Sequence, residues 1–311
     1  MDTRKAIDMQ AIGLMLVLCL VWGFQQVALK ATAPDVAPIM QIALRSGLAA
    51  LLVWLLMLAR GERLALGDGT WRAGMLVGAM FALEFLLVGV GLRLSNASHV
   101  VVFLYTAPIF AALGLHIKLP EERLHALQWV GIALAFAGIV VAFFWRGQHK
   151  AAAAVADDML MGDALSLLGG ATWGATTVVV RTSGLSSLPA TKTLLYQLVA
   201  AFVLLLVAAV ALGQTGFRPT PLAWGNLVFQ TVVVSFASFL VWFWLLRHYV
   251  ASQLGVFSFM SPLFGVAFGV WLLNEPLEPG FVRGAALVLA GIVLVSGHRW
   301  LSEMAMKLRR A

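Results

Sequence analysis

Polar side chains follow one face of the first long apolar segment of this sequence. Trp22, Gln25 and Gln26 are three and four residues apart, so they share one face of a helix. A later apolar segment repeats the arrangement at Trp173, Thr176 and Thr177. Amide and hydroxyl groups are costly in hydrocarbon unless they are paired or hydrated, so both faces are expected to point inward. They could line a path for an amphipathic substrate with a flat apolar part, or they could join packed helices by hydrogen bonds.

One basic and one acidic residue, Arg45 and Glu84, are expected well inside apolar segments. Each lies about eight residues from the outer end of its segment, or roughly 12 Å at 1.5 Å per residue. This equal depth is compatible with an ion pair. Ionisable groups at membrane depth are functional candidates, and Glu84 could carry a coupling proton or meet an α-amino group. A structural salt bridge explains the two residues equally well.

Two prolines, Pro108 and Pro262, are predicted in the middle of helices at equivalent positions of a repeat. Proline removes a backbone hydrogen bond and clashes with the preceding turn, so both helices should kink. A pair of symmetric kinks could serve as hinges for opening one side while the other closes. A static bend is the alternative, because membrane helices tolerate proline.

Several further residues complete the set of candidates. His99 could titrate near neutral pH and corresponds to Gln253 in the repeat, although a histidine near an interface is more often simply hydrogen-bonded. Tyr105 and Ser258 could add polar or aromatic lining. Glu121 and Glu275 fall in loops, where helix capping or conformational locking explains them better than substrate contact.

The composition requires a bilayer around these residues. The chain has 311 residues, of which 61% are hydrophobic and 11% charged, whereas roughly a quarter of a soluble domain is charged. The net charge of +7 reflects Lys and Arg at the ends of apolar runs, which is typical of membrane proteins and argues against nucleic-acid binding. The single cysteine, Cys19, excludes disulfides within the chain and thiolate metal sites, and we expect neither metal nor cofactor.

The fold class expected is an all-α polytopic membrane protein with ten transmembrane helices. Apolar runs that can cross about 30 Å of hydrocarbon fall near 11–30, 37–59, 72–92, 97–117, 124–145, 161–181, 190–212, 222–246, 252–273 and 278–299. Residues 146–160 are expected to form an exposed linker between a first half at 1–145 and a second half at 161–311. With the N-terminus in the cytoplasm, fourteen Lys and Arg residues lie inside and six outside, so both termini are predicted to be cytoplasmic.

The two halves are similar in sequence. Residues 92–110 align with 246–264 without a gap and share eight of nineteen residues, including Pro108 and Pro262. Because each half contains an odd number of helices, the repeats are expected to be inverted in the membrane. Many secondary transporters are built from inverted repeats and bind substrate near the midplane between them.

These residues resemble the drug/metabolite transporter superfamily, in particular its tandem EamA-domain family. The motifs that carry the resemblance are Leu20-Val21-Trp22-Gly23 through Lys30, Leu44-Arg45-Ser46, and the elements Glu121/Gly131/Gly138 and Glu275/Gly284/Gly291. The resemblance implies ten helices and export of small metabolites by alternating access. Within this family the chain is most similar to bacterial aromatic and neutral amino-acid exporters. One departure is Tyr196, which occupies the position of Arg45 in the second repeat.

The predicted function is therefore export of aromatic and other neutral amino acids across a bacterial inner membrane by a monomer. Exporters of nucleobases, drugs or other metabolites are the alternative within the same family. A channel or an intramembrane enzyme is the alternative from another class. An enzyme is disfavoured, because the sequence contains no His-Glu-x-x-His motif and no Cys/His cluster.

Overall fold

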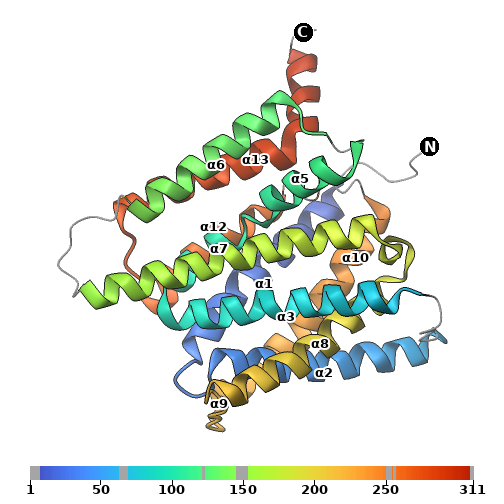
Figure 1. The fold of residues 1–311 in the computed structure, drawn as a ribbon, viewed down its shortest axis with the longest axis vertical. Coiled ribbons are helices and arrows are strands. Elements are labelled where there is room, and N and C mark those ends of the chain that lie inside the picture. Colours follow the sequence, from blue (N-terminus) through green and yellow to red (C-terminus); the bar gives the residue numbers. More distant parts are fainter. Residues whose placement is uncertain are drawn as a thin grey trace.

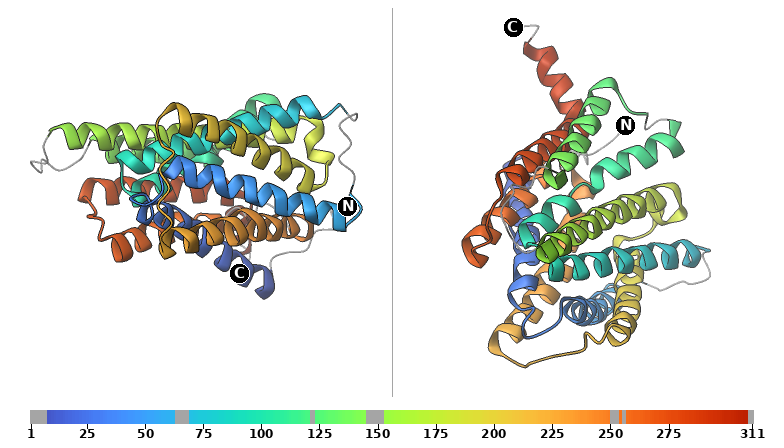
Figure 2. Two further views of the ribbon diagram at one scale, coloured as in Figure 1. Left: turned by 90° about the horizontal axis from the view of Figure 1, so that it is seen from below. Right: turned by 60° about the vertical axis from the view of Figure 1, so that its left-hand side comes forward.

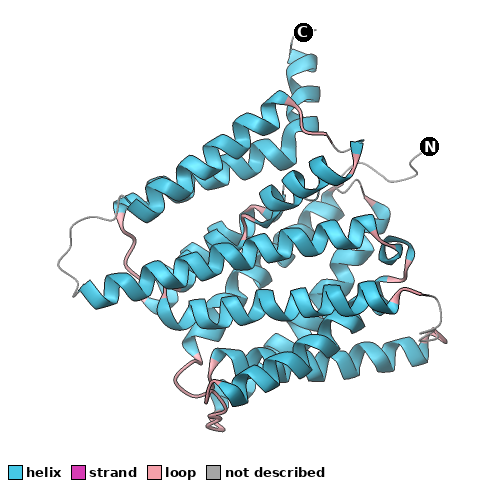
Figure 3. Cartoon of the chain, viewed as in Figure 1, coloured by secondary structure: helices cyan, strands magenta, loops and turns pink. Residues whose placement is uncertain are grey.

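The computed structural model describes residues 8–62, 69–120, 123–144, 153–249, 254 and 257–308. In this part of the chain the regular secondary structure is helical, with no β-strand, and an isolated bridge joins Val36 and Phe217 (Figures 1 and 3). The helices are α1 (Met9–Ala31), α2 (Pro38–Ala59), α3 (Trp71–Leu94), α4 (Ala97–Leu104), α5 (Ala107–Lys118), α6 (Ala126–Phe144), α7 (Ala153–Thr182), η3 (Gly184–Ser187), α8 (Ala190–Ala211), α9 (Pro221–Val228), η4 (Phe229–Ser238), α10 (Phe239–His248), α12 (Met260–Leu273) and α13 (Pro279–Leu308). The all-α fold class is confirmed.

By length and composition, six helical segments of the described chain can cross a membrane. They are Met9–Ala31, Pro38–Ala59, Trp71–Leu94, Ala97–Lys118, Ala190–Ala211 and Pro221–Trp242. Three further apolar helices are shorter, at residues 126–142, 260–273 and 279–295. The number of ten spans and the cytoplasmic placement of both termini stay predictions.

Helix α8 illustrates why the bundle needs lipid. One face packs on α2 and α3 and buries Leu194 and Leu198, while the opposite face exposes Val203, Val207 and Val210. Exposed apolar rows of this kind are unfavourable in water because they remain hydrated. Hydrocarbon tails would cover them at no such cost, so the exposed row marks a surface that faces lipid.

Helices of the two halves interleave. Helix α1 packs on α12, and its counterpart α7 packs on α4 and α5. Helices α2 and α8 pack on each other, and so do α6 and α13, which lie side by side in two views (Figures 1 and 2). Glycines allow α6 and α13 to pack closely, because a Cβ on Gly138 would lie only 2.6 Å from the carbonyl oxygen of Gly284. Small residues permit such close approach of membrane helices.

The fourth helix of the first half is interrupted. Helix α4 ends at Leu104, and α5 begins at Ala107 with Pro108 in its first turn. Pro262 likewise lies in the first turn of α12, after a turn at Phe259. The prediction that both prolines lie mid-helix is therefore wrong, because each stands where a helix begins and no amide donor is needed. Their role as hinges stays a prediction.

The segment 222–246 was expected to be one regular helix, and its middle is not. Residues Phe229–Ser238 form a π-helix, η4, between α9 and α10. A π-helix is rare and frequently marks a functional site. It buries Gln230, Thr231, Ser235 and Ser238 among the other helices.

The predicted linker at 146–160 lies partly outside the described residues. From Ala153 onward the chain already belongs to α7, so the second part of this segment is helical. Alanine has the highest helix propensity, which explains why the Ala-rich run extends the helix. The boundaries of the two halves, 1–145 and 161–311, stay predictions.

Candidate functional site

A buried polar cluster surrounds Arg45, formed by α1, α2, α3 and η4. Arg45 Nη1 donates to Oε1 of Gln25 at 3.2 Å and to Oε1 of Gln230 at 2.5 Å. Gln230 Nε2 in turn donates to the carbonyl oxygen of Gln25 at 2.9 Å. The guanidinium carbon lies 4.6 Å from the centroid of the Phe85 ring. These neutral partners and the cation–π contact hold a charged group that is only 2% exposed.

Glu84 lies near enough to Arg45 to interact with it electrostatically. Within the described chain no salt bridge joins the two side chains, and both Glu84 Oε2 and Arg45 Nε are buried without a hydrogen-bond partner. Opposite charges attract each other, but this attraction offsets the cost of burial fully only when hydrogen bonds also satisfy the remaining polar atoms, and here one atom of each side chain has none. The predicted ion pair is therefore not completed, and one nitrogen of Arg45 and one oxygen of Glu84 remain unpaired.

Gln26 adds uncommitted polar atoms to the same region. Its side chain is fully buried, and neither the amide nitrogen nor the amide oxygen has a hydrogen-bond partner. Thr231 Oγ1, next to Gln230, is also unpaired. Buried polar groups are nearly always satisfied, so each exception calls for an explanation such as an absent ligand or water.

Two aromatic pairs border this polar region. Trp22, one helical turn before Gln25 and Gln26, meets Trp242 edge to face at 5.6 Å between centroids, and its Nε1 donates to Ser238 Oγ at 2.9 Å. Tyr105 meets Trp173 edge to face at 5.4 Å. Trp22 and Tyr105 belong to one buried hydrophobic cluster, and the partly buried Trp173 packs against it. The structure thus brings the two tryptophans expected from the repeat into the same apolar environment.

Other predicted residues have hydrogen-bond partners outside the polar cluster. Thr176 Oγ1 donates to the carbonyl of Thr172 at 2.9 Å, and Thr177 Oγ1 donates to that of Trp173 at 3.2 Å. Both hydroxyls are thus satisfied within their own helix. His99 is bonded to Asp163 at a different place, described below. Ser258 is half-buried, and Gln253 lies outside the described residues.

Sequence reasoning missed the contribution of the π-helix. Gln230 and Ser238 hold Arg45 and Trp22 respectively, yet they come from a segment that was expected to be an ordinary lipid-spanning helix. The available signal was the concentration of Gln230, Thr231, Ser235 and Ser238 in an otherwise apolar run. Asp163 was missed as well, because it stands only two residues inside the predicted start of its span.

The unpaired atoms of the cluster are suited to binding a small charged molecule. Among the described residues no group of three or more His, Cys, Asp or Glu is placed to hold a metal ion. The polar groups that lack partners are a guanidinium nitrogen, a carboxylate oxygen, a primary amide and a threonine hydroxyl. Such groups can bind an anionic and a cationic group of one small molecule, since each would replace a hydrogen bond that the ligand made with water.

A comparison with known families decides what kind of protein this is. The profile of the EamA-like transporter family matches residues 9–144 and again residues 160–297. The chain belongs to the EamA family. It carries two EamA repeats, as the resemblance in the sequence implied, and it is a multi-pass membrane protein of a transporter family.

Curated relatives of this EamA protein are transporters by name. An uncharacterized transporter of Bacillus subtilis, YoaV, is 21% identical over 276 residues, covering 88% of this chain and 92% of the relative. A probable amino-acid metabolite efflux pump of Escherichia coli is 27% identical over 304 residues, covering 92% and 95%. A solved crystal structure has the same fold, with a TM-score of 0.65 and 20% identity over 92% of this chain and 96% of that one.

Proposed function

We propose that this EamA protein exports neutral amino acids with aromatic or other apolar side chains by alternating access across a bacterial inner membrane. The observation that carries the proposal is the Arg45 cluster, in which a buried guanidinium and a buried carboxylate lie close together without pairing. An α-amino acid offers the complementary charges, a carboxylate and an ammonium group, on one carbon atom. The relative named as a probable amino-acid metabolite efflux pump supports the same class of cargo.

Binding of such a zwitterion would satisfy the atoms that now lack partners. The substrate carboxylate would accept a hydrogen bond from Arg45 Nε, and the ammonium group would donate to Glu84 Oε2. The amide of Gln26 could contact either group. The apolar side chain of the substrate would then extend toward the aromatic pairs that contain Trp22 and Trp173. Neutralising two buried charges with one ligand stabilises the loaded site.

The repeated pairing of helices supports alternating access. Helices α1 and α7 occupy equivalent places in the two repeats, and each packs against an interrupted helix of the opposite half. An inverted arrangement of two such units offers two nearly equivalent states, one open to each side. We infer that the N-terminus is cytoplasmic and that the protein acts as a monomer.

The first test measures uptake of labelled phenylalanine, tryptophan and threonine into proteoliposomes, beside an anionic metabolite of similar size. We expect saturable uptake of phenylalanine and tryptophan, with no flux in protein-free liposomes. Ionic currents or non-saturating flux would indicate a channel. Transport of the anion with none of the amino acids would contradict the assigned cargo.

A second test addresses the lining of the site. Gln26→Ala and Trp173→Ala should each raise the KM for phenylalanine about tenfold or more, since each change removes roughly 1–3 kcal/mol of contact with the substrate. Both variants should elute from size exclusion as the unmodified protein does. Thr177→Ala is the matched control on α7, because its hydroxyl is bonded within its own helix and the KM should not change. An unchanged KM in both Gln26→Ala and Trp173→Ala would contradict the proposed lining.

A further inference from the structure

Charged and polar side chains from both halves converge on the beginning of α4. We call this set the α4 N-terminal cluster: Lys30, Ser95, Ser98, His99, Asp163 and Glu275. It lies at the end of the bundle where α1 and α3 end and α4 begins, toward the left in Figure 1. It is separate from the Arg45 cluster and is not used by the transport site proposed above.

Glu275, in the loop after α12, binds the first turn of α4. Its Oε1 accepts from the amide nitrogen of Ala97 at 2.6 Å. Its Oε2 accepts from the amide nitrogen and the hydroxyl of Ser98 at 2.9 and 2.6 Å. The expected capping role of Glu275 is thus the role that the structure shows. Because Glu275 and Ser98 belong to different repeats, this cap joins the two halves.

Asp163 makes a second connection between the halves. Its Oδ2 lies 2.9 Å from His99 Nδ1, and its Oδ1 accepts a hydrogen bond from Ser95 Oγ. The side chains of both His99 and Asp163 are fully buried. The His99 ring also stacks on Phe281 of α13, with 3.7 Å between centroids and 6° between planes. The imidazole is therefore fixed in position by α7 on one side and α13 on the other.

The second nitrogen of His99 has no partner. When Nδ1 donates to the carboxylate, Nε2 carries a lone pair and is a hydrogen-bond acceptor. This Nε2 atom is buried and unpaired within the described chain. Histidine is the residue whose charge changes in the physiological range of pH. A buried, unused lone pair next to a carboxylate is a site at which a proton can bind.

The charges around His99 determine what the proton would do. Asp163 and Glu275 are the acids bonded to this region, and Lys30 Nζ is the cation, which donates to the carbonyl oxygens of Leu92 and Ser95. The helices packed on α4 and the loops that lead into them carry further charged residues. Glu278, just before α13, is half-buried. The others are exposed: Arg93 of α3, Arg283 of α13, and Asp157 and Asp158 of α7. Among the described residues of the cluster, the acids Asp163 and Glu275 outnumber the cation Lys30, which leaves an excess of negative charge. A proton on His99 neutralises it.

An open cleft borders the cluster. It has a volume of about 490 Å³ and is lined by residues that include Lys30, Leu92, Arg93 and Arg218. Lys30 and Leu92 connect the cleft to the cluster, since Lys30 bonds the carbonyl of Leu92. When the two halves separate at this end, the His99–Asp163 pair would open toward this cleft.

We propose that His99 and Asp163 form a proton-binding site whose occupancy holds this end of the transporter closed. The proton from solution binds Nε2 of His99 and gives an imidazolium paired with the Asp163 carboxylate. The neutralised pair is stable between the packed halves, whereas the unprotonated cluster retains a net charge that favours opening and hydration. The proton thus binds the closed conformation more tightly than the open one, and this difference in affinity shifts the equilibrium toward the closed state.

The test follows opening without any substrate, so its outcome is independent of the cargo assigned above. Cys19→Ser removes the single native cysteine, and Ala97→Cys places a thiol at a position that is fully buried in the closed cluster. The labelling rate of this thiol by a maleimide is measured in nanodiscs from pH 5.5 to 8. It is divided by the rate for Gly216→Cys, an exposed position, at each pH to correct for thiol ionisation.

With His99 present, the normalised labelling rate should fall at least about fivefold between pH 8 and pH 5.5, which is the low end of typical coupling between sites. His99→Gln can retain a hydrogen bond to Asp163 but cannot titrate, so the rate should stay constant. Glu275→Gln weakens the cap on α4, so it should raise labelling at every pH, and it removes part of the charge that the proton neutralises, so the pH dependence should become smaller. Ser95→Ala is the matched control, because it removes one bond to Asp163 and no titrating group.

Two results would overturn the proposal. One is the same pH dependence in His99→Gln as in the protein with His99. The other is a thiol at position 97 that stays unlabelled at all pH values even with Glu275→Gln, since this end would then not open through the cluster.

Discussion

Arg45→Gln should reduce the kcat/KM for phenylalanine export by about two orders of magnitude. Truncating one partner of a buried, charge-assisted hydrogen bond costs roughly 2–5 kcal/mol, and the substrate carboxylate would lose the only cation that the proposed site offers it among the described residues. Glu84→Gln should have a comparable effect through the ammonium group. Efflux from preloaded proteoliposomes provides the measurement.

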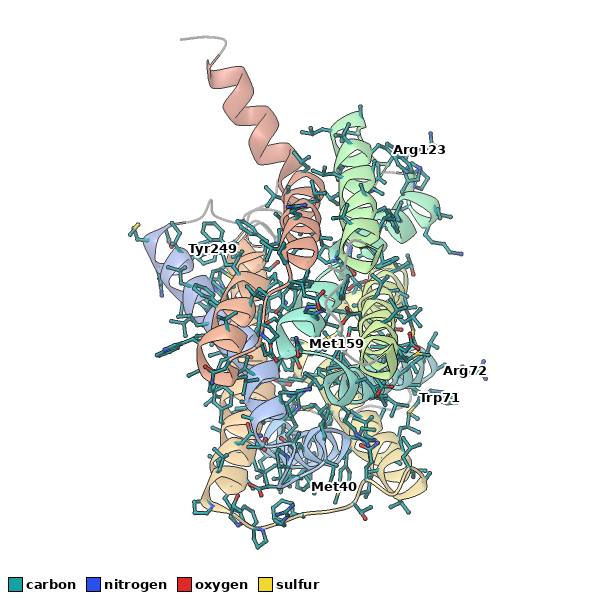
Figure 4. All side chains as sticks on the ribbon, turned by 90° about the vertical axis from the view of Figure 1, so that its left-hand side faces the viewer. Met40, Trp71, Arg72, Arg123, Met159 and Tyr249 are labelled. Carbon is teal, nitrogen blue, oxygen red and sulfur yellow. The ribbon has the colours of Figure 1, made fainter. Side chains whose placement is uncertain are left out.

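Analogues and controls separate this effect from misfolding. Phenethylamine, which lacks the carboxylate, should be affected by Glu84→Gln but hardly by Arg45→Gln, and phenylpropionate should show the reverse. The Arg45→Gln/Glu84→Gln double variant removes both charges of the Arg45 cluster together and leaves neither without its counterpart, so it should fold well and still not transport. Arg72→Gln makes the same change at an exposed arginine that stacks on Trp71 at the edge of the bundle (Figure 4), and transport should persist. Equal losses for all analogues would contradict the assigned roles.

Gly170→Ala should strongly destabilise the folded protein, although the change is a single methyl group. A Cβ at this position of α7 would lie 2.7 Å from Thr106 Oγ1 and 2.8 Å from the carbonyl oxygens of Phe103 and Leu104. These carbonyls belong to the interruption between α4 and α5, and backbone atoms cannot rotate away from the added methyl group as a flexible side chain could. Overpacking of a tight core typically costs 1–3 kcal/mol, and contact with backbone atoms belongs at the upper end of that range.

The neighbouring glycine is a control matched in sequence and helix. A Cβ on Gly169 would make ordinary contacts, with Val88 Cγ2 at 3.5 Å as the nearest atom. Because alanine is the better helix former by roughly 0.5–1 kcal/mol, Gly169→Ala should leave the melting temperature in detergent unchanged or raise it. Equal melting temperatures for the two variants would show that α7 can shift away from the α4–α5 interruption.

Much of the fold can be predicted from the sequence, because membrane insertion imposes simple requirements. Long apolar runs must be helices in hydrocarbon, and this reasoning located α1, α2, α3 and α8 to within a few residues. The shared face of Trp22, Gln25 and Gln26 followed from helix geometry alone, and all three side chains are buried. The repeat at Trp22 and Trp173 also led to the family, which the profile comparison confirmed.

The remaining features depend on tertiary contacts that no local pattern specifies. The π-helix η4 is stable because Gln230 and Ser238 find partners on α1 and α2. Thr176 and Thr177 repeat the spacing of Gln25 and Gln26. The threonine hydroxyls are short enough to bond the carbonyl oxygen four residues earlier in their own helix, whereas the glutamine amides extend farther from the helix. Equivalent positions in the repeat therefore acquired different partners. The same holds for Arg45 and Tyr196, which share a position but not a charge.

The interleaving of the halves has a consequence for how the chain is made. Helix α1 packs mainly on α12, whose first residue is Met260, so α1 enters the membrane while more than two thirds of the chain remains to be synthesised. Until then Gln25, Gln26 and Arg45 have neither η4 nor α12 beside them. The first repeat therefore reaches its final packing only after helices of the second repeat have been inserted beside it. Truncation near the C-terminus should thus be detected by quality-control proteases as an unfinished N-terminal half.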